Sequence, residues 1–194
     1  SLTDASTGEF VTVTCDEASL ICIYGSYLID ERTAGLDLGE GSGPDRQGFG
    51  TSIANMGDMN NDGINDIAVG ATQGLDMYGT NHFVTSENGA VYILFLDTDG
   101  SPKSVAVIDK DTTNGPGSTA LNGYGSAVEN IGDLDNNGVN DLAVGNYFDG
   151  GNSDSNGKGA VYIHFMNADG SLTKASTVIK DGVTNAPTLA TGDR

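Results

Sequence analysis

Short apolar runs alternate with turns rich in Gly, Asn and Asp along most of the chain. The runs are rich in β-branched and aromatic residues, which suit a pleated and half-buried surface and therefore predict strands. Two pairs of runs, 89–95 with 104–108 and 159–165 with 176–179, are each joined by a turn that contains a residue pair Asp-Gly. Such pairs predict β-hairpins. The pattern as a whole predicts an all-β protein.

The same order of segments occurs twice. Each copy has a glycine-rich start, a nine-residue polar loop, a short apolar run and a Val-Tyr-Ile strand, at 48–53, 58–66, 67–70 and 89–95 and again at 123–128, 133–141, 142–145 and 159–165. The offset is 75 residues at the polar loops and 70 at the Val-Tyr-Ile strands, so the polar insert is five residues shorter in the second copy. Each copy predicts four antiparallel strands, the size of a propeller blade.

The N-terminal segment matches only the second half of this unit. Its runs 10–14 and 20–24 predict a hairpin equivalent to the last two strands of a blade. We therefore expect three parts: an N-terminal half-blade hairpin and loop at 1–45, a complete blade at 46–120, and a second complete blade with a C-terminal linker at 121–194. Because a ring of even four blades at roughly 70 residues each exceeds this length, a closed monomeric propeller is not expected. Open blade faces are association sites.

The two polar loops have the spacing of a calcium loop. Both place oxygen-bearing side chains at positions 1, 3, 5 and 9 and a Gly at position 6, and Ca²⁺ prefers six to eight such oxygens, including a carbonyl from position 7. An EF-hand is excluded because position 12 is Val69 in one loop and Val144 in the other. The alternative is a pair of polar turns that hold no metal. The expected ligands of the two Ca²⁺ sites are Asp58, Asn60, Asp62, the Ile64 carbonyl and Asp66, and Asp133, Asp135, Asn137, the Val139 carbonyl and Asp141.

Composition excludes several classes of partner. The net charge of −19, with 8 Lys and Arg against 27 Asp and Glu, argues against nucleic acid and against an anionic membrane surface. No apolar run approaches the ~18 residues of a transmembrane helix. Cys15 and Cys22 flank a turn between predicted strands, so we expect a disulfide between them, with two free thiols in the core as the alternative. Calcium and a disulfide together predict an extracellular or cell-surface protein.

Catalytic signatures are absent from the sequence. No nucleophile elbow, Walker loop, dinucleotide fingerprint or zinc-protease motif occurs. Of the two histidines, His82 falls in a polar loop and His164 in the second Val-Tyr-Ile strand, where a surface or packing role is the simpler interpretation. We expect no enzymatic activity.

The repeated unit resembles the FG-GAP repeat, which forms the blades of the integrin α-subunit β-propeller and is carried by many bacterial and archaeal surface proteins. Phe49-Gly50 and Tyr124-Gly125 take the FG positions, and residues 70–72 and 145–147 take the GAP positions in degenerate form. The resemblance covers about residues 46–180. It implies calcium at the loop residues named above and blades of four antiparallel strands. The propellers of the family have seven blades, whereas this chain has two and a half.

Two functions are favoured at this point over a third, an enzyme domain of the kind sometimes built on such propellers. The first is a non-enzymatic extracellular calcium-binding protein, structural or adhesive, that assembles with its own copies head to tail into a ring or a filament. The second is a ligand-binding module, for a glycan or a protein, cut from a larger cell-surface FG-GAP propeller protein.

Overall fold

The computed structural model describes residues 28–29, 47–73, 89–117, 123–147, 149 and 158–188. These residues form two four-stranded sheets in which every neighbouring pair of strands is antiparallel and strand order follows the sequence. The first sheet contains β1 (Gln47–Gly57), β2 (Asp66–Gln73), β3 (Ala90–Leu96) and β4 (Pro102–Ile108). The second contains β5 (Tyr124–Gly132), β6 (Asp141–Asn146), β7 (Ala160–Met166) and β8 (Leu172–Lys180).

The all-β prediction and the two blades of four antiparallel strands are confirmed. The predicted N-terminal hairpin and the Cys15–Cys22 disulfide lie outside the described residues. The division into three parts at 45 and 120 stays a prediction. None of the described residues forms a helix long and apolar enough to cross a membrane.

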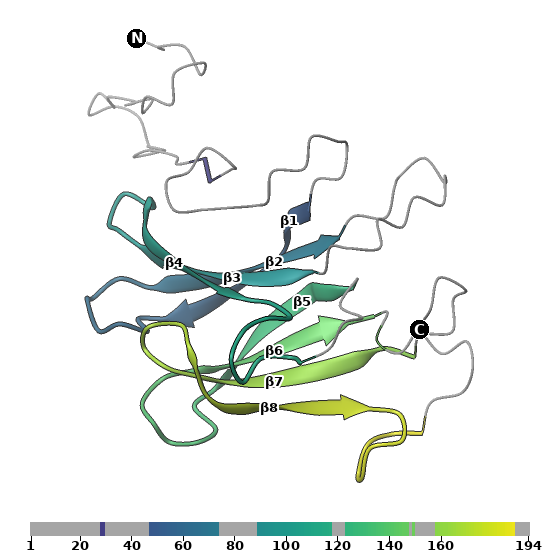
Figure 1. Ribbon diagram of the computed structural model, residues 1–194. Coiled ribbons are helices and arrows are strands. Elements are labelled where there is room, and N and C mark those ends of the chain that lie inside the picture. Colours follow the sequence, from purple (N-terminus) through teal and green to yellow (C-terminus); the bar gives the residue numbers. More distant parts are fainter. Residues whose placement is uncertain are drawn as a thin grey trace, which may run out of the picture.

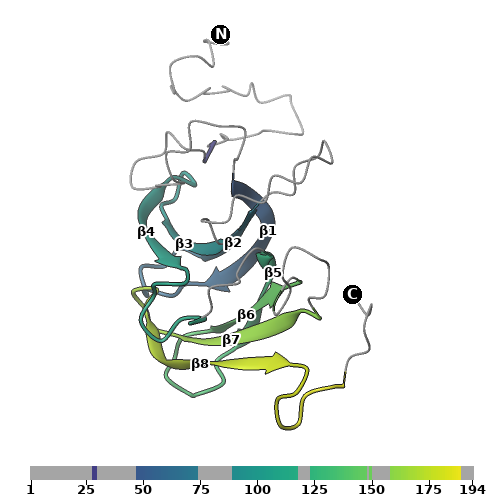
Figure 2. The ribbon, with the colours of Figure 1, turned by 45° about the vertical axis from the view of Figure 1, so that its right-hand side comes forward.

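The two sheets are stacked face to face (Figure 1; Figure 2). Side chains alternate along each strand, so each sheet has two different faces. We call the face that carries Val91 and Phe95 the rear face of the first sheet, and the face that carries Tyr162 and His164 the front face of the second sheet. These two faces meet and share one hydrophobic core, with Tyr124, Leu142, Met166 and Leu172 from the second sheet. The front face of the first sheet, with Tyr92 and Leu94, contacts Ile29 in a separate cluster.

Glycines let the two sheets approach closely. A Cβ at Gly70 on β2 would lie only 2.0 Å from the carbonyl oxygen of Gly125 on β5. The same carbonyl accepts a hydrogen bond from the Ser52 hydroxyl at 2.8 Å. Any side chain at Gly70 would therefore push the blades apart.

Asparagine side chains of the second blade fix its position along the first. Asn130 Nδ2 donates to the carbonyl of Asn55 at 2.8 Å, and Asn140 Nδ2 donates to the carbonyl of Met56 at 2.9 Å. Both acceptors lie near the end of β1, directly before the first polar loop. These hydrogen bonds hold the two polar loops in a fixed relation.

A second hydrogen-bonded connection between the blades includes the buried side chain of His164 on β7. Ser176 Oγ donates to the carbonyl of Asn114 at 2.7 Å, so it accepts a hydrogen bond from Nδ1 of His164 at 2.6 Å. The other ring nitrogen, Nε2, then accepts from the Tyr124 hydroxyl at 2.6 Å. His164 is fully buried and neutral, with its proton on Nδ1. Of the two roles expected for His164, packing is confirmed and a surface position is wrong.

This histidine makes stability depend on pH. Burial lowers the pKa of His164 from 6.5 to about 4, so the unfolded chain binds more protons between these values. The histidine therefore contributes stability at neutral pH that is lost as the pH falls from 6.5 to about 4, by about 3 kcal/mol at most. Leu94 occupies the equivalent position of the first blade, which makes His164→Leu the matched variant. In urea unfolding, the unfolding free energy of the wild type should fall relative to that of His164→Leu as the pH is lowered across this range. Equal pH dependence of the unfolding free energy in the two proteins would contradict the assignment.

Candidate functional site

The position-1 aspartates shape the two polar loops. Asp58 accepts hydrogen bonds from the backbone N–H groups of Asp62 and Gly63, both at 2.9 Å. Asp133 accepts the equivalent pair, from Asn137 at 3.0 Å and Gly138 at 2.8 Å. One carboxylate thereby closes each loop into a tight turn.

The Asn and Gly residues of the loops supply the conformations that this turn requires. Asn61 and Asn136 have φ values of 59° and 60°, and the position-6 residues Gly63 and Gly138 have φ values of 90° and 91°. Asn and Gly are the residue types that adopt this left-handed region at least cost. Repetition of the same angles in both loops shows that the sequence pattern specifies one loop conformation.

The position-9 aspartates are the most buried acidic groups of the loops. Asp66 and Asp141 have no exposed surface. Asp66 accepts from the N–H of Met59 at 3.0 Å and from that of Leu96 at 3.1 Å. Burial raises the pKa of Asp66 against the effect of these hydrogen bonds, and the charges of Asp62 and Asp58 raise it further. A cation within the loop would relieve both effects.

In the second loop, three carboxylates converge. Oxygen atoms of Asp133, Asp135 and Asp141 all lie within 4.8 Å of one another, the one such acidic group found across the described ranges. Within those ranges, Oδ1 of Asp135 is also the one buried side-chain polar atom that has no hydrogen-bond partner. A buried charged oxygen without a partner is costly. This donor set of hard oxygens fits a hard divalent cation such as Ca²⁺.

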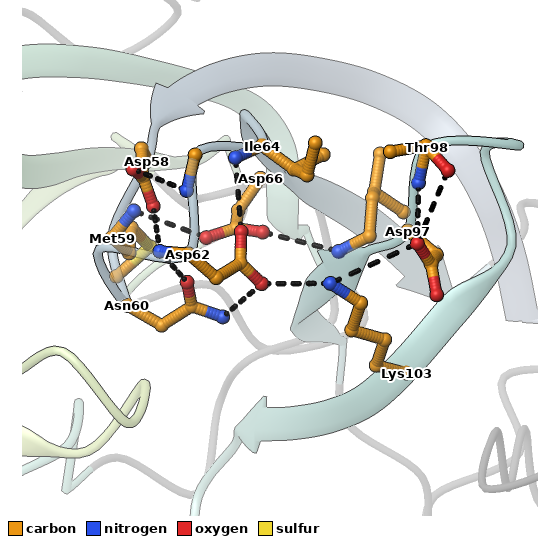
Figure 3. Close-up of polar contacts among 11 residues, drawn as sticks. Asp58, Met59, Asn60, Asp62, Ile64, Asp66, Asp97, Thr98 and Lys103 are labelled. Carbon is orange, nitrogen blue, oxygen red and sulfur yellow. Dashed lines mark hydrogen bonds and ion pairs between the residues drawn. The ribbon is translucent and has the colours of Figure 1, made fainter.

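In the first loop, a lysine reaches the site. Figure 3 shows Lys103 extending from β4, with Nζ 2.8 Å from Oδ2 of Asp62 and 3.9 Å from Oδ1 of Asp97. Asn60 Nδ2 donates to the same Asp62 oxygen at 3.1 Å. The hydrogen bond from Lys103 is the main reason why the pKa of Asp62 is lowered. The carboxylate of Asp62 is therefore neutralised by an internal cation.

The second loop has a lysine as well, at a different place. Its additional carboxylate stands at position 3, as Asp135, rather than at position 5. Lys174 Nζ lies 3.2 Å from Oδ2 of Asp135 and 3.8 Å from the centre of the Phe165 ring. Thr173, which follows the start of β8 as Lys103 follows that of β4, lies 3.3 Å from the same oxygen. In each copy a lysine therefore lies beside the additional carboxylate, which stands at position 5 in the first loop and at position 3 in the second.

The position-7 residues are held by side chains of position 5. The N–H of Ile64 donates to Asp62 Oδ1 at 2.9 Å, and that of Val139 donates to Asn137 Oδ1 at 2.8 Å. The ten sequence-predicted ligands thus belong to two loops of one conformation. Their assignment as calcium ligands stays a prediction. Sequence analysis did not identify Lys103, Lys174 or Thr173, because nothing in a strand sequence indicates which loop it lies beside.

Comparison with known proteins places this geometry in a family. The model of the FG-GAP repeat matches residues 49–94, which run from β1 through the first loop into β3. This chain belongs to the FG-GAP repeat family. It is 35% identical over 131 residues to integrin alpha-6 of Gallus gallus, which is 68% of this chain and 10% of that protein. It is 37% identical over 100 residues to integrin alpha-IIb of Mus musculus, covering 51% of this chain and 8% of that protein.

The FG-GAP chain thus spans about a tenth of the length of the integrin α relatives that it matches. Integrin alpha-PS5 of Drosophila melanogaster is 30% identical over 121 residues, which is 62% of this chain and 10% of that protein.

The motif that names the family has a packing role here. Phe49 lies edge-on to Tyr92, with ring centroids 5.5 Å apart, and Tyr124 lies edge-on to Tyr162 at the same distance.

The lysine of the first FG-GAP loop should compete with a bound cation. We expect Lys103→Met to tighten calcium binding at this loop by up to about fivefold, because Lys103 occupies an oxygen of Asp62 and an exposed ion pair of this kind is weak. The same variant should melt at a slightly lower temperature in EDTA. Calorimetric titration with Ca²⁺, together with melting curves in EDTA, measures both effects. Equal affinity and equal apo stability would show that Lys103 is a bystander.

Proposed function

We propose that the chain is a calcium-binding, non-enzymatic part of an extracellular or cell-surface adhesion protein, in which Ca²⁺ rigidifies the two FG-GAP loops. The convergence of Asp133, Asp135 and Asp141 around the unpartnered oxygen of Asp135 is the observation that carries the proposal. The residues that would hold the two ions are the ten named from the sequence. The kinship with integrin α subunits supports the adhesive role.

The charge of the chain supports a stabilising role for the ions. The net charge is −19, and acidic groups gathered in one loop repel one another. Each Ca²⁺ would offset two negative charges at the points where they are most concentrated. Lys103 and Lys174 supply only part of this compensation in the absence of metal. Calcium would replace the contact with a single lysine by coordination to several oxygens at once.

Self-assembly is the finer part of the proposal. Among the described residues, no blade packs on the face of the second sheet that carries Val161 and Ile179, which are each 41% exposed. A contact between copies that joins unlike surfaces forms a ring if it closes and a filament if it does not. The structural function would then lie in the assembled form. A protein or glycan ligand remains the alternative use of the same surface.

Asp135 offers the cleanest test of the metal assignment. Unlike Asp133, it is not used to close the loop backbone, so Asp135→Ala should leave the apo fold nearly intact. When free calcium is 100-fold above Kd, an occupied site adds about 2.7 kcal/mol to stability, or roughly 5 to 10 °C in Tm for a chain of this size. The variant should lose most of this increment in Ca²⁺ and change little in EDTA. Asp62→Ala is the corresponding variant of the first loop.

Asp111→Ala is the matched control, because Asp111 is an exposed aspartate outside both loops. Its Tm should change equally little with and without calcium. Equal losses for Asp135→Ala in both conditions, or no calcium-dependent change in wild-type Tm, would defeat the metal assignment.

A further inference from the structure

One charged pair of the first blade is replaced by an uncharged pair in the second. The turn between β3 and β4 starts at Asp97 and that between β7 and β8 starts at Asn167, and the two turns share their backbone hydrogen bonds. The strand register places Lys103 on β4 and Thr173 on β8 at equivalent positions. The first blade therefore combines an acid with a lysine where the second combines an amide with a hydroxyl.

The ammonium group of Lys103 lies between two carboxylates of the first blade (Figure 3). Its Nζ is 2.8 Å from Oδ2 of Asp62, which is a hydrogen-bonding distance, and 3.9 Å from Oδ1 of Asp97, which is an ion-pair distance only. A lysine ammonium has rotatable donors on a flexible chain. A shift of about 1 Å would bring it within hydrogen-bonding distance of Asp97. The lysine therefore has a second acceptor within reach.

The carboxylate of Asp97 is oriented to act as that acceptor. Its Oδ1 accepts a hydrogen bond from the N–H of Thr98 at 2.7 Å and lies 3.3 Å from the Thr98 hydroxyl (Figure 3). These contacts fix the carboxylate at the start of the turn. The Asp97 side chain is also 48% exposed. It can therefore accept the ammonium without a change in its own turn.

An ion in the first loop would require Lys103 to move. Both oxygens of Asp62 have partners, since Oδ1 accepts from the N–H of Ile64 at 2.9 Å and Oδ2 accepts from Asn60 Nδ2 at 3.1 Å as well as from the lysine. A divalent cation on this carboxylate would compete for the same lone pairs and repel the ammonium. The lysine thus acts as a counter-ion that belongs to the chain and compensates the charge of Asp62 in the absence of metal.

The second loop can accept an ion without an equivalent displacement. Oδ1 of Asp135 is buried and has no hydrogen-bond partner in the described part of the chain. The position equivalent to Lys103 carries the neutral hydroxyl of Thr173, 3.3 Å from Asp135 Oδ2, which a cation does not repel. Lys174 lies 3.2 Å from that same Oδ2, with its Nζ 3.8 Å from the centre of the Phe165 ring, and so leaves Oδ1 open.

We propose that Lys103 is a displaceable internal counter-ion, which passes from Asp62 to Asp97 when the first loop binds Ca²⁺, and that the second loop, which lacks this exchange, binds Ca²⁺ first. The inference rests on the proposed function, because it concerns how the same two loops are filled. Asp97 lowers the cost of the exchange, since the ammonium keeps an ionic partner. The exchange also makes the contacts of the turn between β3 and β4 depend on whether the first loop is filled.

Nitrogen-15 NMR of the lysine ammonium groups and carbon-13 NMR of the aspartate carboxyl groups follow the exchange directly. Lys103→Met and Asp97→Asn assign the two signals by their disappearance. During a Ca²⁺ titration of the full chain, both signals should shift together, and in Lys103→Met the Asp97 carboxyl signal should shift much less. A Lys103 signal that is unchanged at saturating Ca²⁺, or an Asp97 signal that shifts as much without the lysine, would overturn the proposal.

Calorimetric titration measures what Asp97 contributes. In an Asp135→Ala background, where the second loop should no longer bind, Asp97→Asn should weaken Ca²⁺ binding by up to about fivefold, the strength of an exposed ion pair. When Lys103→Met is also present, the same substitution should have a much smaller effect. Asp99→Asn is the matched control, because it removes one charge from the same turn but Asp99 binds the N–H of Ser101. Its effect should be small and equal with and without the lysine.

The outcomes separate this inference from the metal assignment. If Ca²⁺ binds to the first loop but Asp97→Asn weakens binding equally with and without Lys103, the exchange is overturned and the metal assignment stands. Filling of the first loop before or together with the second, with Asp62→Ala and Asp135→Ala identifying the two sites, would overturn the order of binding. Absence of calcium binding in the wild-type chain would overturn the proposed function itself.

Discussion

The buried position-9 carboxylate is the constraint on which each blade depends. Asp141 has no exposed surface, and its two oxygens accept from the N–H of Leu134 at 2.8 Å and from that of Met166 at 2.9 Å. One side chain at the start of β6 therefore ties the loop before it to the end of β7. Asp66 makes the equivalent pair of bonds in the first blade. A charge without access to water requires this degree of compensation.

The loops also contain more acidic groups than their local structure needs. The position-1 and position-9 aspartates are satisfied by backbone N–H groups, which suffices to form the turn. The negative charges of Asp62 and Asp135 are not required for that purpose. Asp62 accepts from the N–H of Ile64 just as the uncharged Asn137 accepts from that of Val139, and a lysine lies beside each of the two carboxylates. Carboxylates whose charge the turn does not need are expected where a cation binds. The alternative of a metal-free polar turn does not account for the unpartnered oxygen of Asp135.

Sequence analysis could predict what is local or repeated. Alternation along 89–95 and 159–165 gave the strands, and the second copy of the Asp/Asn/Gly spacing gave both loops. Contacts between distant segments could not be predicted in this way. The first blade has Leu94 at the position of His164, so the repeat does not predict a buried histidine. Its burial is explained by its hydrogen-bond partners Tyr124 and Ser176, which come from other strands. Likewise, nothing in the sequence of the turn around Asn114 indicates that its carbonyl binds β8.

Metal binding and blade packing are linked through the residue that follows the position-1 aspartate of the first loop. Met59 lies in the core between the blades, and its N–H donates to a carboxylate that would bind the ion. A free energy that couples two binding events acts equally in both directions. In the second loop the residue at the same place, Leu134, also donates its N–H to the position-9 carboxylate, but its side chain is 53% exposed. An ion in the first loop would therefore be coupled to the packing of the two blades through Met59, and the same coupling requires that blade packing favour the ion. An ion in the second loop would not be coupled to that packing through Leu134.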